Sequence, residues 1–115
     1  MVTGGAASSG GGLSIVLINA PPDDAPRIAR ALVEQKLAAC VNVIPGVKSF
    51  YFWDGALQED SESTLVVKTT DAALEDLTAA VKKLHPYSLP EVIALPLSDA
   101  GNPEYLSWVK GSVRG

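Results

Sequence analysis

Residues 39–70 read ACVNVIPGVKSFYFWDGALQEDSESTLVVKTT, and they contain two long runs of β-type residues on either side of Asp54-Gly55. The first run, residues 39–53, is rich in β-branched and aromatic side chains, and the second covers roughly residues 57–70. An Asp-Gly pair is typical of a two-residue hairpin turn, because both residues tolerate a positive φ angle. Pro45-Gly46 predicts a bulge in the first strand, since proline cannot donate a ladder hydrogen bond. The segment therefore predicts an unusually long antiparallel hairpin.

Two more strands and three helices are expected outside this hairpin. Residues 13–20 (LSIVLINA) form a nearly continuous apolar run, which predicts a strand buried on both faces. Residues 26–36 and 74–84 place apolar side chains at helical spacing, residues 91–97 (EVIALPL) predict a further strand, and Asn102-Pro103 opens a terminal helix. The order β-α-β-β-α-β plus a helix is typical of an α+β, ferredoxin-like split β-α-β sandwich. Two helices are then expected to cover one face of an antiparallel sheet.

Aspartates stand where the first two helices are expected to begin. Asp23 and Asp24 come just before Pro26, and Asp71 follows the hairpin directly. An aspartate side chain accepts hydrogen bonds from the free N–H groups of a first helical turn. We therefore expect side-chain capping at the start of the first helix and Asp71 as the N-cap of the second.

Length and composition limit the class of protein. A chain of 115 residues with 47% hydrophobic and 19% charged residues has room for one globular domain. Residues 13–115 are expected to form that domain, and residues 1–12, rich in Gly, Ser and Ala, to be a flexible tail. The net charge of −4 and the lack of a basic cluster argue against nucleic acid and membranes as partners. A single cysteine, Cys40, and the lack of signal-peptide features predict a cytoplasmic protein.

The far end of the hairpin contains four consecutive aromatic residues, Phe50 to Trp53. Strands of about 13 residues extend past a sheet whose other strands have about 5 or 6, and an isolated two-stranded ribbon is marginal in water. Four adjacent aromatic residues place rings on both faces of that ribbon, so we expect another surface to cover them. Self-association is the preferred explanation, and coverage by the helices or the N-terminal tail is the alternative.

Motifs along the whole chain resemble those of the CutA family, in the same order. They are residues 37–42 (LAACVN), 51–55 (YFWDG), 59–62 (EDSE), 67–69 (VKT), 85–87 (HPY), Pro90-Glu91 and residues 105–108 (YLSW). The resemblance covers nearly all of residues 15–113. It implies a ferredoxin-like protomer in a homotrimer joined through long hairpins and sheet edges, and a fold shared with the PII signalling proteins. It also implies a role in tolerance of copper and other divalent cations.

His85 and Cys40 are the candidate metal ligands. A thiol suits copper, and an imidazole is a common metal ligand. Both residues also have a structural explanation, because Cys40 stands in an apolar setting typical of an inert thiol and His85 stands at a helix C-terminus. One cysteine and one histidine do not complete a site, so Cu2+ or another divalent cation would need carboxylates or a neighbouring subunit. Asn19 replaces a cysteine that some family members have, and no obligatory cofactor is expected.

The resemblance also implies that a second set of candidates gathers at clefts between subunits. It comprises Trp53, Glu59, Glu62, Lys68, Tyr87 and Glu91. Charged residues within or beside apolar strands cost free energy unless they are paired. These side chains either bind a small molecule or an ion, or form an intersubunit network of salt bridges and hydrogen bonds that sets the register of the trimer.

Two functions follow from these candidates. The first is a trimeric metal-binding protein that responds to copper or another divalent cation, and the alternative is a PII-like regulatory or scaffold protein that binds a small molecule. No catalytic residue is assigned, because the chain has neither a serine nucleophile elbow nor a phosphate-binding loop between a strand and a helix. The apolar setting of Cys40 also argues against an activated thiol. An enzyme is therefore not expected.

Overall fold

The computed structural model describes residues 12–115, which form one four-stranded sheet and three α-helices. The strands are β1 (Leu13–Ala20), β2 (Cys40–Trp53), β3 (Ala56–Thr70) and β4 (Ile93–Pro96). The helices are α1 (Ala25–Glu34), α2 (Leu74–Leu84) and α3 (Pro103–Ser112), and a short 3-10 helix, η2 (Asp71–Ala73), precedes α2. The flexible tail expected over residues 1–12 lies outside the described residues, apart from Gly12.

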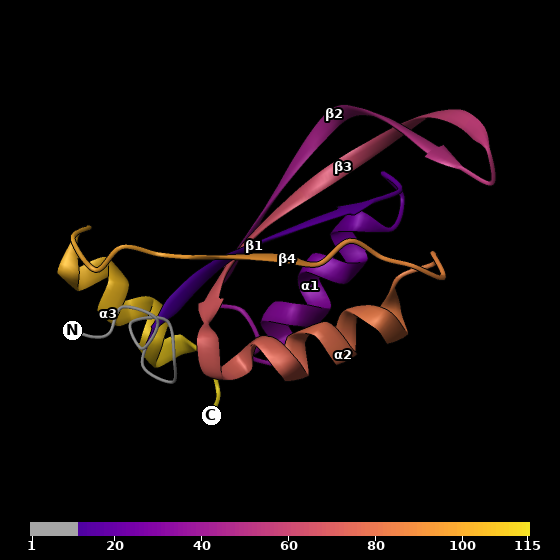
Figure 1. The fold of residues 1–115 in the computed structure, drawn as a ribbon. Helices are drawn as coiled ribbons and strands as arrows, with labels where there is room; N and C mark the ends of the chain where they lie inside the picture. Colours follow the sequence, from indigo (N-terminus) through magenta and orange to yellow (C-terminus); the bar gives the residue numbers. More distant parts are fainter. Residues whose placement is uncertain (1–11) are drawn as a thin grey trace.

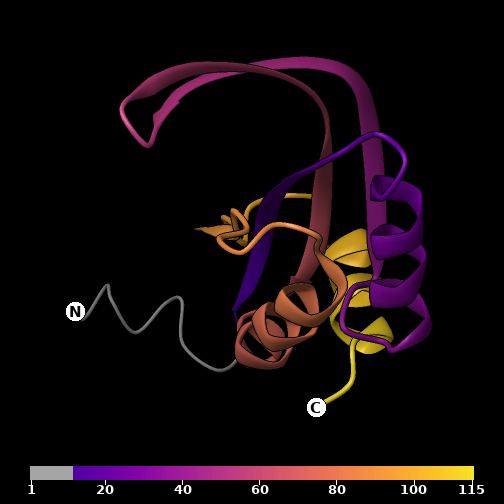
Figure 2. The same cartoon turned by 90° about the vertical axis from the view of Figure 1, so that its right-hand side faces the viewer.

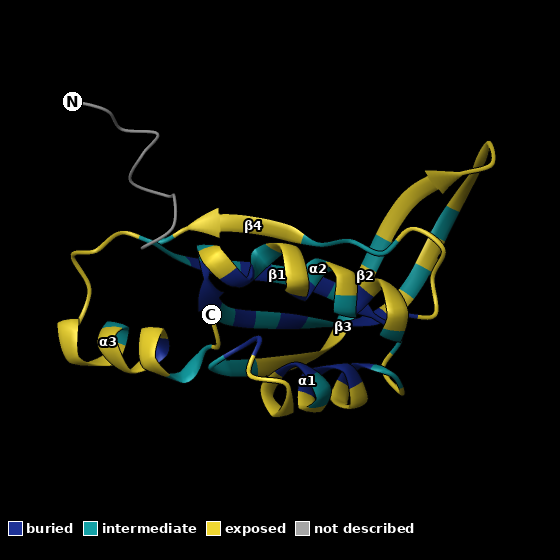
Figure 3. Ribbon diagram, turned by 90° about the horizontal axis from the view of Figure 1, so that it is seen from below, coloured by how far each residue is buried: buried dark blue, intermediate teal, exposed yellow. Residues whose placement is uncertain are grey.

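The sheet has the strand order β2-β3-β1-β4, and all neighbouring strands are antiparallel. Helices α1 and α2 lie on one face of it (Figures 1 and 3), and α3 lies at the end where β1 begins (Figure 1). This arrangement confirms the predicted α+β, ferredoxin-like fold.

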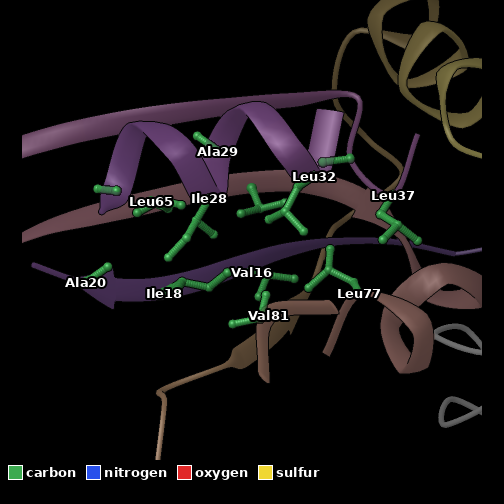
Figure 4. Close-up of a cluster of buried hydrophobic side chains, with 13 residues drawn as sticks. Val16, Ile18, Ala20, Ile28, Ala29, Leu32, Leu37, Leu65, Leu77 and Val81 are labelled. Atoms are coloured by element: carbon green, nitrogen blue, oxygen red, sulfur yellow. The ribbon is translucent and has the colours of Figure 1, made fainter. Parts of the chain in front are cut away.

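The hydrophobic core lies between the sheet and the first two helices. Alternate residues of β1 and β3 point toward the helices, and the apolar ones among them pack against α1 and α2 (Figure 4). The fully buried members include Val16, Ile18, Ile28, Leu32, Leu65, Val67, Leu77 and Val81. Within β3, Leu65, Val67 and Thr69 are buried, in keeping with the alternation of side chains along a strand.

The opposite side of the sheet, which we call the open face, has an apolar centre and is not covered by any helix of residues 12–115 (Figure 1). Leu17 of β1 pairs with Val66 on one side and with Ile93 on the other, so these three side chains share this face. Leu17 and Val66 are only partly buried, and Ile93 is exposed. The prediction that β1 is buried on both faces therefore holds for one face of a single chain, and the other face remains accessible.

The long hairpin extends well past the rest of the sheet. Strand β3 pairs with β1 only from Thr70 to Ser63, so residues 47–62, which we call the arm, form a two-stranded ribbon (Figures 1 and 2). The predicted bulge appears as a register shift between Ile44 and Val47. In the protomer the aromatic residues of the arm are exposed, Phe50 by 62% and Phe52 by 74%, so the helices do not cover them.

Side-chain capping of the first two helices was predicted wrongly. The Asp24 carboxylate makes no capping bond and pairs with Arg27 at 2.8 Å. Asp71 begins η2, and its carboxylate accepts a hydrogen bond from the Ser14 hydroxyl, while Ala73 occupies the N-cap position of α2. For Asp24 a nearby arginine has replaced the capping bond, and for Asp71 a partner distant in sequence has done so, which local sequence patterns do not reveal. The third helix begins at Asn102-Pro103 as expected, and the Asn102 side chain accepts from the Glu104 N–H at 3.1 Å.

The turn at the tip of the arm leads to a first prediction. Asp54 and Gly55 have φ angles of 52° and 76°, which confirms the predicted left-handed turn. Gly55→Ala is expected to lower the free energy of unfolding by about 1 kcal/mol, because a Cβ is strained in that conformation. Gly111→Ala is the matched control: Gly111 lies within α3 and nothing lies within 4 Å of an added Cβ. Gly111→Ala should stabilise the protein by up to about 1 kcal/mol. Urea denaturation measures both variants, and equal changes in the free energy of unfolding would show that Gly55 is not needed for its left-handed conformation.

Candidate functional site

A pocket of about 560 Å3 lies where the arm leaves the body of the protein. Three segments distant in sequence form its wall: the end of β1, the arm and the loop after α2. The lining residues are Asn19, Ser49, Phe50, Tyr51, Trp53, Glu62, Tyr87, Ser88, Leu89 and Glu91. This volume is within the range of small-molecule sites.

His85 attaches the loop after α2 to the end of β1. The Tyr87 N–H donates to His85 Nδ1 at 3.1 Å, and His85 Nε2 lies 2.7 Å from the Asn19 carbonyl oxygen. Since Nδ1 accepts, Nε2 must hold the hydrogen and donate it to that carbonyl. The ring is 6% exposed and lies 4.7 Å from the Tyr87 ring, centroid to centroid. Both ring nitrogens are thus used to position one wall of the pocket.

Glu62 and Tyr87 form the polar centre of the pocket. The Tyr87 hydroxyl donates to Glu62 Oε2 at 2.9 Å, and the Glu62 residue is 5% exposed. Burial, together with the hydrogen bond to Glu62 and its charge, raises the pKa of Tyr87 well above its usual range. The phenol therefore stays protonated and remains a donor to the carboxylate at physiological pH.

Glu91 brings a second carboxylate into the same pocket. Asn19 Nδ2 donates to Glu91 Oε1 at 3.3 Å, and Asn19 Oδ1 in turn accepts from the Thr64 hydroxyl at 2.6 Å. Burial, and to a smaller extent the charge of Glu62, raises the pKa of Glu91. The two carboxylates are near enough to repel each other, and neither forms an ion pair within residues 12–115.

This raised pKa of Glu91 gives a second prediction. A raised pKa means that the folded protein favours the protonated form of Glu91. This contribution to stability is fully present below the ordinary pKa of a glutamate and is lost as the pH rises through the raised pKa. Glu91→Gln removes the charge, so it should raise the free energy of unfolding at about pH 7 by less than about 1 kcal/mol and have no effect near pH 4. Glu34→Gln, on the exposed side of α1, should change neither value. A loss of stability at neutral pH in Glu91→Gln would show that the charge stabilises the fold.

The two candidate metal ligands lie at different ends of the sheet. Cys40 lies opposite Lys68 of β3, and Lys68 in turn lies opposite Ile15 of β1. His85, in contrast, contacts Asn19, four residues further along β1. At the rise of a β-strand, this offset is about 13 Å. Nowhere in residues 12–115 do three His, Cys, Asp or Glu side chains group in a way that could hold a metal ion. One protomer therefore does not bring Cys40 and His85 into a common site.

Four of the six candidate cleft residues line the pocket together, namely Trp53, Glu62, Tyr87 and Glu91. The other two do not. The Glu59 carboxylate lies on the arm, 3.8 Å from Lys48 Nζ. The Lys68 ammonium donates to the Asn42 side chain and lies 4.0 Å from Cys40 Sγ.

Asn19 is the residue whose role in the pocket was not expected. Its side chain accepts from Thr64 and donates to Glu91, and its carbonyl meets His85. The only signal in the sequence is a polar residue near the end of an otherwise apolar strand. Its partners follow 45, 66 and 72 residues later, so only the folded chain identifies them.

Comparison with known proteins assigns the chain to a family. The family model of the CutA1 divalent ion tolerance protein matches residues 14–112. The chain belongs to this family. The divalent-cation tolerance protein CutA of Thermus thermophilus is 52% identical over 97 residues, which are 84% of this chain and 93% of that relative.

Solved structures of the family share the whole fold. The crystal structure of CutA1 from Oryza sativa has a TM-score of 0.87 and 43% identity, over 90% of this chain and 95% of that one. The PII-like protein CutA from Nostoc sp. PCC 7120, in apo form, has a TM-score of 0.84 and 40% identity, over 88% and 97% of the two chains. Some relatives are longer, and the chain covers 56% of the chloroplastic protein CutA 1 of Oryza sativa. None of the helices formed by residues 12–115 has the length and apolarity needed to cross a membrane.

Proposed function

We propose that the protein acts in divalent-cation tolerance as a homotrimer that binds a small ligand, as a PII-like regulatory or scaffold protein does. The observation behind this proposal is the pocket, where three segments distant in sequence bring hydrogen-bonded carboxylates together with aromatic rings. Such a concave, mostly apolar site with a few fixed polar groups is typical of small-molecule binding. A cytoplasmic location belongs to the same proposal, because a single thiol suits a reducing compartment.

Self-association is supported by two apolar surfaces that one protomer leaves accessible. The open face contains Leu17, Val66 and Ile93, and the arm exposes its aromatic rings. Monomeric proteins rarely leave such extended apolar surfaces in water. Because the arm also lines the pocket, a neighbouring copy that holds the arm would complete the site. The number of three copies comes from the resemblance to the family.

Direct copper binding is the second candidate, because the family model describes divalent ion tolerance and the Cys40 thiol is only half-buried. His85 and Cys40 are its proposed ligands. Such a site needs groups from a neighbouring copy, since the His85 ring nitrogens are occupied within the protomer and Cys40 lies elsewhere on the sheet.

Native mass spectrometry of the purified protein tests these proposals. The protein should be a trimer, and after incubation with a pool of small metabolites it should retain one of them. Tyr87→Ala should release this metabolite, whereas Tyr105→Ala, on α3 outside the pocket, should retain it. A trimer that retains no metabolite, but takes up Cu2+ in whole-number steps that Cys40→Ser or His85→Ala abolishes, would establish the copper function instead. A monomer under every condition would overturn both proposals.

A further inference from the structure

The charged side chains that line the pocket are all acidic, and several others are aromatic. Glu62 and Glu91 provide carboxylates, and Trp53, Tyr51 and Tyr87 are among the aromatic residues. None of the lining residues is Lys, Arg or His. A ligand that carries negative charge would meet two carboxylates without a compensating cation in this lining.

Within residues 12–115 of one protomer, neither carboxylate forms an ion pair. Glu62 is almost fully buried, and the hydrogen bond from Tyr87 satisfies only one of its oxygens. Glu91 accepts a single bond, from Asn19. Two carboxylates that share a partly desolvated site repel each other, which the raised pKa of Glu91 also reflects. A cation placed between them would remove this repulsion.

The size and composition of the pocket favour an organic cation over a bare metal ion. Its volume of about 560 Å3 far exceeds the space of a single ion. A first-row metal ion needs three or four ligands, and residues 12–115 do not assemble three candidate ligands anywhere. Aromatic rings, in contrast, attract ammonium groups through their faces, and tryptophan does so most strongly.

We propose that this pocket binds an organic ammonium ion, a small molecule whose positive nitrogen is met by Glu62 and Glu91 and whose carbon groups lie against the aromatic lining. This inference rests on the proposed ligand-binding function and names the chemical class of the ligand. The Tyr87 hydroxyl holds the Glu62 carboxylate in place, and Asn19 does the same for Glu91. The acceptor groups are therefore oriented before a ligand arrives, which lowers the entropic cost of binding.

Calorimetric titration of the intact protein with choline tests the proposal. Two comparison ligands are used: the neutral isostere of choline, in which a tert-butyl group replaces the trimethylammonium group, and the dianion succinate. Choline should bind, its neutral isostere should bind at least about tenfold more weakly, and succinate should not bind. Glu62→Gln should weaken choline binding by about tenfold. Glu34→Gln, which removes one carboxylate on the exposed side of α1, should leave it unchanged.

Glu91→Gln provides a second variant, since it is expected to fold at least as stably as the parent protein and should also weaken choline binding. Equal affinities for choline and its neutral isostere would overturn the proposal, because the charge would then be irrelevant. Binding of succinate without choline would overturn it as well, while the proposed ligand-binding function would stand. If none of the three binds, the inference fails. The proposed function fails too only if native mass spectrometry finds no retained metabolite.

Discussion

Val66→Asp is expected to convert the proposed trimer into a folded monomer. Val66 lies on the open face, on the opposite side of β3 from the core residues Leu65 and Val67. In an isolated protomer the new carboxylate reaches water, so the fold should survive. In the proposed trimer each copy would bury a charge at this interface, at a cost of several kcal/mol per copy. Sedimentation velocity should show a monomer at micromolar concentration, and circular dichroism should show unchanged secondary structure.

Val33→Asp is the matched control for this variant. Val33 is 41% exposed and lies on α1, on the opposite side of the molecule from the open face. The same substitution there should leave the trimer intact. Val66→Thr, which keeps the shape of the side chain and adds one hydroxyl, should weaken association without abolishing it. A stable trimer in Val66→Asp would exclude the open face from the interface.

His85→Ala is expected to lower the free energy of unfolding by about 2 to 4 kcal/mol in protein treated with a chelator. The change removes a buried ring and leaves the Asn19 carbonyl and the Tyr87 N–H without their partners. The loop that forms one wall of the pocket would lose its attachment to β1. Urea denaturation at matched protein concentration measures this effect, because the stability of an oligomer depends on concentration.

Lys83→Ala serves as the control for His85→Ala. Lys83 lies in the last turn of α2, and its side chain is exposed, so its removal should cost less than about 0.5 kcal/mol. If His85→Ala leaves the chelator-treated protein unchanged and destabilises it only when Cu2+ is present, the residue is a metal ligand. If His85→Ala lowers the free energy of unfolding equally with and without metal, His85 supports the wall of the pocket and does not bind metal.

Most of the fold can be predicted from the sequence. The apolar run at residues 13–20, the helical spacing in α1 and α2, and the Asp54-Gly55 turn are local patterns, and the structure confirms all three. The boundaries were less accurate, because β4 covers only Ile93–Pro96 of the expected residues 91–97. Strand β4 pairs only with Ser14 to Leu17, although β1 itself continues to Ala20.

The pocket was foreseen only in part. Resemblance to the family suggested Glu62, Tyr87 and Glu91, and these three do lie together. Lys68 belongs to the same set, yet it lies on β3 beside Cys40 and Asn42. Sequence motifs indicate which residues matter without indicating which of them are neighbours.

The sequence by itself determined the order of the elements, the long arm and its turn, because each depends on residues only a few positions apart. The tertiary structure alone decided that Asn19 joins the pocket and that both nitrogens of His85 are occupied. It also decided that the Asp71 carboxylate meets Ser14 instead of capping α2. These contacts depend on the register of strands and loops far apart in the chain, which hydrophobic periodicity does not specify.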